Sequence, residues 1–303
     1  MNSGEYVVYR GEKILVEYRS LDLSDCEIED LGDVEGLSDC INLISLDLSG
    51  NPLKEIRGLE NLQRLRSVWA MGCKLTHTGG FENLVNLREL KFLNNSISEI
   101  KGLEKLSKLE VLEFGTNKIV EIKGLEGLKN LYELKFGDSH LQSKNLIKEI
   151  QGLEHLERLN YLDLSYNHIE EIKGLDNLRN LTGLVLNYNK ISELKGLDNL
   201  HNLTYLHAIG NQITEIKGLE NLSNLRTLYL DDNVIVEIKN IAELNSINRF
   251  TLRNNPLETF GELLDVKLKN LIELNVCNTN VPDSEIKRLR KIYQENRHFT
   301  LGI

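Results

Sequence analysis

The sequence predicts an α/β solenoid of about twelve coils with capped ends. Short strands would form a parallel sheet on its concave side, and 3₁₀-like or short helical segments would form its convex side. Three observations predict this: a 22-residue period, an alternation of leucines inside each period, and an asparagine at the ninth position of most periods. Self-similarity at a fixed period is typical of repeat architectures.

The period is visible from Leu43 onward as L-x-x-L-x-L-x-x-N-x-L, and the pattern begins again at Leu65, 22 residues later. Other intervals between starts are longer, such as the 28 residues that follow Leu131. In each period the L-x-L core, such as Leu46-Asp-Leu48, alternates inward and outward as a strand does. The starts are Tyr18, Leu43, Leu65, Leu87, Leu109, Leu131, Leu159, Leu181, Leu203, Leu225, Ile247 and Leu271.

Polar and small residues recur at fixed places in the period. An amide at the ninth position both donates and accepts, so a stack of them can satisfy buried backbone groups where the chain leaves the strand. Cys26 and Cys73 occupy the same position, which makes them structural substitutes for asparagine. A later Gly-Leu-Glu or Gly-Leu-Asp unit, as at Gly102, falls where the outer arc turns back, next to apolar residues three apart that suit 3₁₀-like segments.

The 22-residue unit, as in residues 203–224, resembles the leucine-rich-repeat class named after a regulatory subunit of protein phosphatase 1. The resemblance covers residues 18–281 and implies a horseshoe whose concave sheet binds protein. It identifies no partner, because the class includes phosphatase regulators, a spliceosomal scaffold protein and a dynein light chain. The tail lacks the capping motif of the phosphatase regulators.

The ends are predicted to cap the repeats, since terminal coils would otherwise expose their core. Residues 1–17 read as a β-hairpin cap, with Tyr6–Tyr9 and Ile14–Val16 flanking Arg10–Lys13. Residues 282–303 read as a helix N-capped by Ser284 and running to about Asn296, followed by a last strand. With repeats over 18–281, we expect a single domain over 1–303.

Composition limits the partners and the location. The formal net charge is −10, which disfavours nucleic acid and anionic membrane surfaces as partners. No apolar run approaches the ~18 residues of a membrane helix, and the start does not read as a secretory signal. Four scattered cysteines fit a reducing compartment. We expect a cytoplasmic protein, monomeric on its own.

Residues that flank the strand leucines face the concave side and would contact a partner. Tyrosine and the single tryptophan gather there, whereas Phe92, Phe114 and Phe136 take an inward position. Exposed Tyr and Trp near Arg are typical of interface hot spots. The alternative is that Tyr suits strands and its rings cover one another. The candidate partner-binding residues are Trp69, Met71, Leu93, Tyr161, Tyr166, Val185, Tyr188, Tyr205, His207, Ile209, Tyr229, Arg249 and Arg253.

The sequence carries no phosphate-binding loop, zinc-hydrolase motif or serine-nucleophile elbow, and its seven histidines do not recur with ligand-like partners. An open sheet also does not exclude water, which makes electrostatic catalysis difficult. We therefore expect no enzyme, no catalytic residue, no metal and no cofactor. About six extra residues within 141–149 are either a second contact point or a tolerated surface loop.

These observations predict a protein-interaction scaffold, adaptor or regulatory subunit that binds a protein on its concave face. Two alternatives stay open. One is an RNA-associated scaffold, in which Tyr faces stack on bases and Arg249 and Arg253 meet phosphates. The other is a structural spacer without a concave ligand. The partner's identity and pathway do not follow from the sequence.

Overall fold

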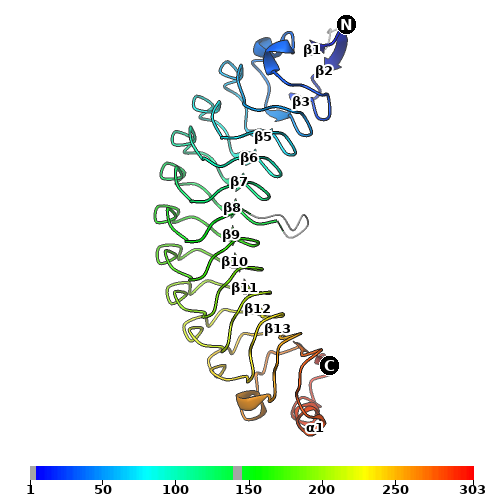
Figure 1. Cartoon of the computed structure of the whole chain (residues 1–303), viewed down its shortest axis with the longest axis vertical. Coiled ribbons are helices and arrows are strands. Elements are labelled where there is room, and N and C mark those ends of the chain that lie inside the picture. Colours follow the sequence, from blue (N-terminus) through cyan, green and yellow to red (C-terminus); the bar gives the residue numbers. More distant parts are fainter. Residues whose placement is uncertain (1–4, 139–144) are drawn as a thin grey trace. The chain divides into compact units, whose positions relative to one another are not determined.

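The computed structural model describes residues 5–138 and 145–303, which fall into two compact units, Met1–Leu146 and Ile147–Ile303. In each unit, successive coils add one short strand to a parallel sheet, and neighbouring coils follow one another along the unit (Figure 1). The solenoid with a parallel sheet is therefore confirmed. That the whole chain is one domain stays a prediction.

The N-terminal unit opens with an antiparallel hairpin of two strands, which lies where the hairpin cap was expected. Tyr18, the predicted start of the first coil, is fully exposed. Its backbone is left-handed, at φ 52°, just before β3. The elements are β1 (Tyr6–Tyr9), β2 (Glu12–Leu15), β3 (Ser20–Asp22), η1 (Leu31–Asp33), η2 (Leu37–Asp39), β4 (Ser45–Asp47), β5 (Ser67–Trp69), β6 (Glu89–Lys91), β7 (Val111–Glu113) and β8 (Glu133–Lys135).

The C-terminal unit continues the same pattern and ends in a helix and a strand. The helix α1 begins one residue before the predicted N-cap Ser284, because Pro282 takes the N-cap position, and it ends four residues before the expected Asn296. The elements are β9 (Tyr161–Asp163), β10 (Gly183–Val185), β11 (Tyr205–His207), β12 (Thr227–Tyr229), β13 (Arg249–Thr251), η3 (Gly261–Leu264), β14 (Glu273–Asn275), α1 (Asp283–Ile292) and β15 (Thr300–Gly302).

Each coil buries the leucines of its strand and of its outer turns, and the phenylalanines predicted to point inward are fully buried. Phe92 and Phe114 stack with ring centroids 5.5 Å apart, as do Phe114 and Phe136 at 5.4 Å. The outer segments differ from continuous 3₁₀ helices in most coils. They are pairs of consecutive turns closed by bonds between residues three apart, such as Leu106 N to Leu103 O and Leu109 N to Leu106 O.

The asparagine ladder is confirmed. Asn117 donates from Nδ2 to the carbonyl oxygens of Phe92 (2.8 Å) and Phe114 (3.0 Å), and its Oδ1 accepts from the backbone N–H of Ile97 (2.9 Å). Cys73 takes the same place by donating from Sγ to the Leu48 carbonyl at 3.3 Å. Burial raises the pKa of that thiol to about 11, which fits a structural role.

Asn145 corrects the position of the predicted insertion. Its amide donates to the carbonyls of Phe114 (2.9 Å) and Phe136 (2.8 Å) and accepts from Ile119 N, so it is the ladder residue of its coil. Residues 145–149 are thus part of a regular coil, and the extra residues precede Asn145. The rest of the predicted segment, 141–144, lies outside the described residues.

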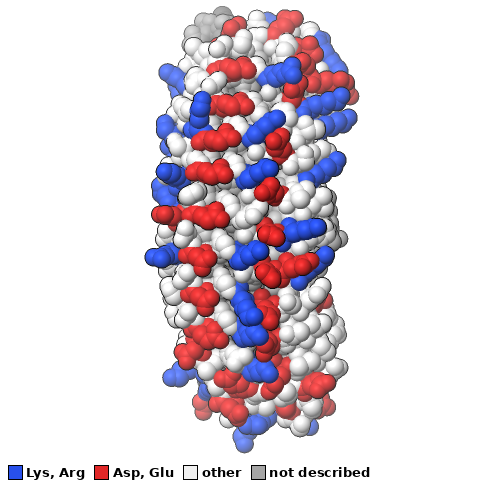
Figure 2. Space-filling view, turned by 60° about the vertical axis from the view of Figure 1, so that its left-hand side comes forward, with Lys and Arg blue, Asp and Glu red and all other residues white. Residues whose placement is uncertain are grey.

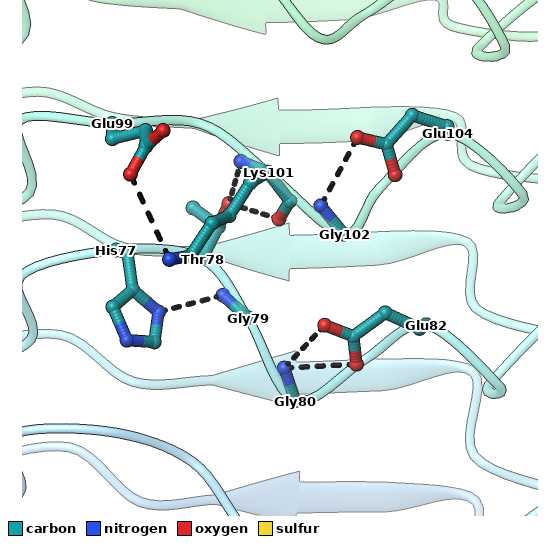
Figure 3. A network of polar contacts seen from close by, with 9 residues as sticks. All are labelled: His77, Thr78, Gly79, Gly80, Glu82, Glu99, Lys101, Gly102 and Glu104. Carbon is teal, nitrogen blue, oxygen red and sulfur yellow. Dashed lines mark hydrogen bonds and ion pairs between the residues drawn. The ribbon is translucent and has the colours of Figure 1, made fainter.

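Glycines with positive φ close the outer turns. The N–H of Gly102 donates to Glu104 Oε1 at 3.2 Å, and that of Gly80 donates to both carboxylate oxygens of Glu82 (Figure 3). Lysine–glutamate pairs such as Lys101–Glu99 and Lys123–Glu121 stand beside these turns. Figure 2 shows acidic and basic side chains gathered in columns on one face. No helix in the described residues is long and apolar enough to cross a membrane.

Candidate interaction surface

The candidate surface of the C-terminal unit is built by the strand residues that point away from the core. The parallel register places Tyr161, Gly183, Tyr205 and Thr227 in one row, and Val185, His207 and Tyr229 in the next. Adjacent strands stand ~4.8 Å apart, so aromatic side chains in one row are within contact distance of one another. Residues separated by 22 or more positions in the chain thereby become neighbours.

Four rings of this unit form one contiguous group. Tyr161 and Tyr205 have centroids 6.1 Å apart, Tyr205 and His207 5.5 Å, and His207 and Tyr229 4.4 Å in a stacked arrangement. All four side chains are half-buried. We call these four residues together the aromatic row, with Tyr161 and Tyr205 from the first of the two rows above and His207 and Tyr229 from the second. Its rings cover part of one another, as the alternative interpretation of the tyrosines requires, but each keeps an exposed portion.

A glycine under one ring explains how the row lies so close to the backbone. A Cβ added to Gly183 would come within 2.0 Å of the Tyr205 ring, so that ring lies directly over the Gly183 backbone. In the same way, the ring of Tyr188 lies over Gly210. Sequence reasoning did not single out these glycines. The sequence signal that could have identified them is a glycine 22 residues before or after a tyrosine, because residues 22 apart are neighbours in adjacent coils.

Tyr166 and Tyr188 occupy backbone positions that most coils give to small residues. Both have positive φ, 55° and 54°, where neighbouring coils place Gly210, Asp232 or Asn254. A bulky side chain in this conformation is strained. Their rings stack at 4.6 Å, which offsets part of the strain. Tyr188 remains 42% exposed.

Two predicted surface residues are buried, which corrects the expectation that they are open to a partner. Tyr166 is only 7% exposed, because the ring of Tyr188 lies against it. Val185 is also 7% exposed, since it lies between Asp163 and the larger His207 on the adjacent strands. Neither side chain can serve as a direct anchor in this conformation.

The border of the aromatic row carries the predicted arginines and one acid. Arg249 Nε lies 3.4 Å from Glu273 Oε2, so it is already paired. Arg253 is exposed, and its backbone N–H donates to Asp231 Oδ1 at 2.8 Å. Burial outweighs this bond and raises the pKa of Asp231. Ile209, in the row beyond His207, is half-buried.

The surface of the N-terminal unit has a different character. Trp69 pairs across strands with Asp47 and Lys91, and its indole N–H is buried without a hydrogen-bond partner in the described structure. Met71 and Leu93 are half-buried on the adjoining row, and Leu93 lies over Gly115. Trp69, Met71 and Leu93 therefore form a small apolar group.

An ion-pair network that sequence reasoning did not assemble lies beside this group. Lys91 and Lys135 flank Glu113 at 3.7 and 3.2 Å, and each also pairs with the glutamate of its own strand, Glu89 or Glu133. Burial opposes the charged form of Lys91, but the Glu89 hydrogen bond and the nearby carboxylates outweigh it and raise the pKa of Lys91. The network is a charged, locally satisfied part of the surface.

Burial lowers the pKa of His207, so the neutral imidazole is favoured at neutral pH. No group of three or more His, Cys, Asp or Glu able to hold a metal ion occurs in the part of the chain that the structure describes. The geometry thus offers aromatic and apolar contacts bordered by charge.

Comparison with known proteins agrees with this architecture. Residues 42–65 match the model of the leucine-rich repeat, and residues 157–199, 179–221 and 201–246 match the model of paired leucine-rich repeats. The chain contains leucine-rich repeats. The phosphatase-regulator class of 22-residue repeats is not distinguished by these matches. None of the curated proteins compared with the chain matches it.

Solved leucine-rich-repeat structures share the fold. An internalin (inlF) of Listeria monocytogenes has 26% identity and a TM-score of 0.71, with 96% of this chain and 89% of that chain covered. A leucine-rich-repeat protein of Leptospira interrogans has 23% identity and a TM-score of 0.56, covering 95% and 96%. The TLR13–ssRNA13 complex has 19% identity and a TM-score of 0.54, covering 93% and 54%. Leucine-rich-repeat proteins are generally protein-interaction scaffolds, and the matched models indicate no catalytic family.

Proposed function

We propose that this chain is a non-catalytic interaction scaffold that binds a protein partner through the strand surface of its C-terminal unit. The observation that carries the proposal is the aromatic row, in which Tyr205 and His207 on β11 and Tyr229 on the adjacent β12 have rings in contact and partly exposed. Rigid aromatic side chains bury a large area on binding and lose little conformational entropy.

The surroundings of the row support a protein ligand. Ile209 adds apolar surface beside it, and the exposed Arg253 stands at the border. An apolar and aromatic centre with a charged rim is the usual composition of a protein interface. The strained backbone of Tyr188, which holds an exposed ring where other coils use small residues, also supports a binding role.

The test is affinity capture from source lysate with two matched variants. Tyr205→Ala/Tyr229→Ala removes two rings of the row, while Tyr18→Ala/Tyr132→Ala removes two exposed tyrosines of the N-terminal unit. We expect the first variant to lose a protein that wild type and the control retain, with at least a tenfold loss of affinity when that protein is purified.

Folding is checked first by the melting temperature, because the rings also pack on one another. If a folded row variant keeps the same partners at unchanged affinity, the row is not the binding surface. Capture of RNA in place of protein, with affinity falling steeply as salt rises, would instead support the RNA-associated alternative. Replacement of the rings of the row by charged side chains without any loss of partner binding would support the structural spacer.

We also propose that the repeats belong to the phosphatase-regulator class and that the protein acts in the cytoplasm as a monomer before binding. Supporting observations are the 22-residue period with paired outer turns and the four free cysteines, two of which are buried. Cell fractionation that places the protein in an oxidising compartment would contradict the location.

A further inference from the structure

A cationic hollow of about 310 Å³ lies at the start of the strands in the N-terminal unit, and none of the aromatic or apolar residues described above lines it. It is lined by four arginines and a lysine together with one isoleucine and one asparagine, and no acidic side chain lines it. The lining residues are Arg19, Ile44, Arg64, Arg66, Asn86, Arg88 and Lys108. In a chain of net charge −10, such a local excess of positive charge is unexpected.

The repeat itself brings these cations together. The N–H of Arg66 donates to Ile44 O and that of Arg88 donates to Arg66 O, each at 2.8 Å, so the two arginines hold the same position in adjacent coils. Coils are spaced ~4.8 Å apart along the sheet, which lets two guanidinium groups converge on one ligand. Arg64 lies two residues before Arg66. Lys108 lies two residues before Glu110, which takes the position of Arg66 and Arg88 in its own coil.

The C-terminal unit shows that the fold does not need cations at these positions. There, the equivalent residues are Asn180 and Thr182 in one coil and Asn202 and Thr204 in the next. Asn180 donates to Glu157 O at 2.9 Å, and Thr204 donates to Thr182 O at 2.9 Å, so short polar side chains fulfil the structural role. The arginines are therefore departures from what the repeat requires.

The cations are also poorly neutralised. Arg64 donates to the Asn42 amide oxygen at 2.9 Å and Lys108 to that of Asn86 at 2.6 Å, both uncharged acceptors. Arg88 pairs with Glu110, which is not among the residues that line the hollow. Within residues 5–138 and 145–303, no carboxylate lies within ion-pair distance of Arg19 or Arg66. By contrast, lysines of the outer turns, such as Lys101 and Lys123, are paired with glutamates.

We propose that this hollow binds a phosphate monoester, carried by a phosphorylated segment of a partner protein. Arginine presents a planar fork that matches two phosphate oxygens, and a dianion can engage two such forks at once. The residues that line the hollow come from only a few coils, which suits one or two phosphate groups. A long polynucleotide would instead meet the acidic remainder of the chain.

The test measures binding by calorimetry at low salt to four probes. They are a glycine-rich pentapeptide with a central phosphoserine, its unphosphorylated form, inorganic phosphate and a ten-nucleotide oligouridine. We expect the phosphopeptide to bind most tightly and its unphosphorylated form not to bind. Affinity should rise with pH through about 6, where the phosphate becomes a dianion.

Three double variants show whether the hollow is the site. Arg66→Gln/Arg88→Gln should weaken phosphopeptide binding at least tenfold, while Lys118→Gln/Lys129→Gln, which removes the same charge from exposed positions of the same unit, should change it less than twofold. Arg66→Lys/Arg88→Lys keeps the charge but loses the forks, and should weaken binding at least threefold. The side chains at all four substituted positions are exposed, and measured melting temperatures check that each variant is folded.

Four results would overturn the proposal. Equal losses of affinity in Arg66→Gln/Arg88→Gln and in the control variant would indicate binding by the general positive potential of the surface and not by a defined site. Full binding by Arg66→Lys/Arg88→Lys would indicate the same. Oligouridine binding as tight as the phosphopeptide would assign the hollow to RNA. Inorganic phosphate binding as tight as the phosphopeptide would assign it to the free ion and remove the phosphoprotein as its source.

Discussion

At the residue scale, single side chains complete backbone hydrogen bonding that the fold leaves open. A solenoid coil turns sharply after each strand, and the carbonyls there have no strand partner. Asn117 supplies donors for two of them and accepts one N–H in the adjacent coil. Cys73 supplies a weaker S–H donor only, which explains why most coils use asparagine. Most coils thus depend on one buried amide.

His207 makes stability depend on pH in a predictable direction. Burial lowers its pKa in the folded state, so the unfolded chain binds a proton more readily. Its contribution is therefore present above the ordinary histidine pKa of about 6.5 and is lost as pH falls through that value toward the lowered one. We expect His207→Phe, which keeps a ring against Tyr229, to lose less stability than wild type on acidification from pH 7.5.

Denaturant unfolding at a series of pH values checks this expectation. Because many carboxylates titrate in the same range, the informative quantity is the difference in free energy of unfolding between wild type and variant at each pH. His155→Phe, at an exposed position, serves as the control. A difference that does not vary with pH for His207→Phe would refute the prediction.

At the element scale, the outer turns determine how closely coils stack. Gly196 and Gly58 hold the same kind of turn, with φ of +80° and +83°. A Cβ at Gly196 would lie 2.2 Å from the carbonyl oxygen of Ile172, whereas a Cβ at Gly58 would meet nothing within 4 Å. The same backbone conformation is thus tightly packed at one turn and open at the other.

These two glycines allow the cost of the backbone conformation to be separated from the cost of the contact. Gly58→Ala should lower the free energy of unfolding by about 1 kcal/mol, the cost of a left-handed alanine. Gly196→Ala should cost at least about 1 kcal/mol more, because the carbonyl of the preceding coil must move. Thermal or denaturant unfolding measures both, and equal losses would show that the turn relaxes without strain.

At the scale of the whole molecule, stability is built from contacts between neighbouring coils. Each described strand pairs only with the strands before and after it. Such an arrangement lacks long-range cross-links, so an uncapped end would fray first. In the C-terminal unit, Glu285 of α1 binds the cap to the last coils by accepting from Phe260 N (2.7 Å) and Thr259 Oγ1 (2.9 Å).

Loss of this cap should therefore have a graded effect along the C-terminal unit. We expect Glu285→Ala to accelerate hydrogen exchange at Phe260 and in β14 and β15, while β10 and β11 keep their protection. Lys287→Ala, at an exposed position of the same helix, should change neither region. Uniform acceleration over all strands of the unit, measured by mass spectrometry, would mean that the unit unfolds as one and would contradict nearest-neighbour stability.

The sequence by itself determined the period, the strand positions and the ladder. The pattern around Leu46, Leu48 and Asn51 leads directly to a strand followed by a turn, because pleat and hydrogen bonding require those residue types in that order. It also predicted that tyrosines gather on the strand surface. These features depend on local backbone geometry, which one period of sequence already contains.

The tertiary structure alone decided which side chains remain accessible and which come together. Tyr166 and Val185 share the predicted face yet are buried, because exposure depends on the volume of side chains 22 residues away. Arg66 and Arg88 converge on one hollow for the same reason. Asn145 is the ladder residue of its coil although it does not stand at the ninth position of the period. Its place in the ladder depends on which amide lies within hydrogen-bond distance of the strand carbonyls, which sequence spacing alone does not determine.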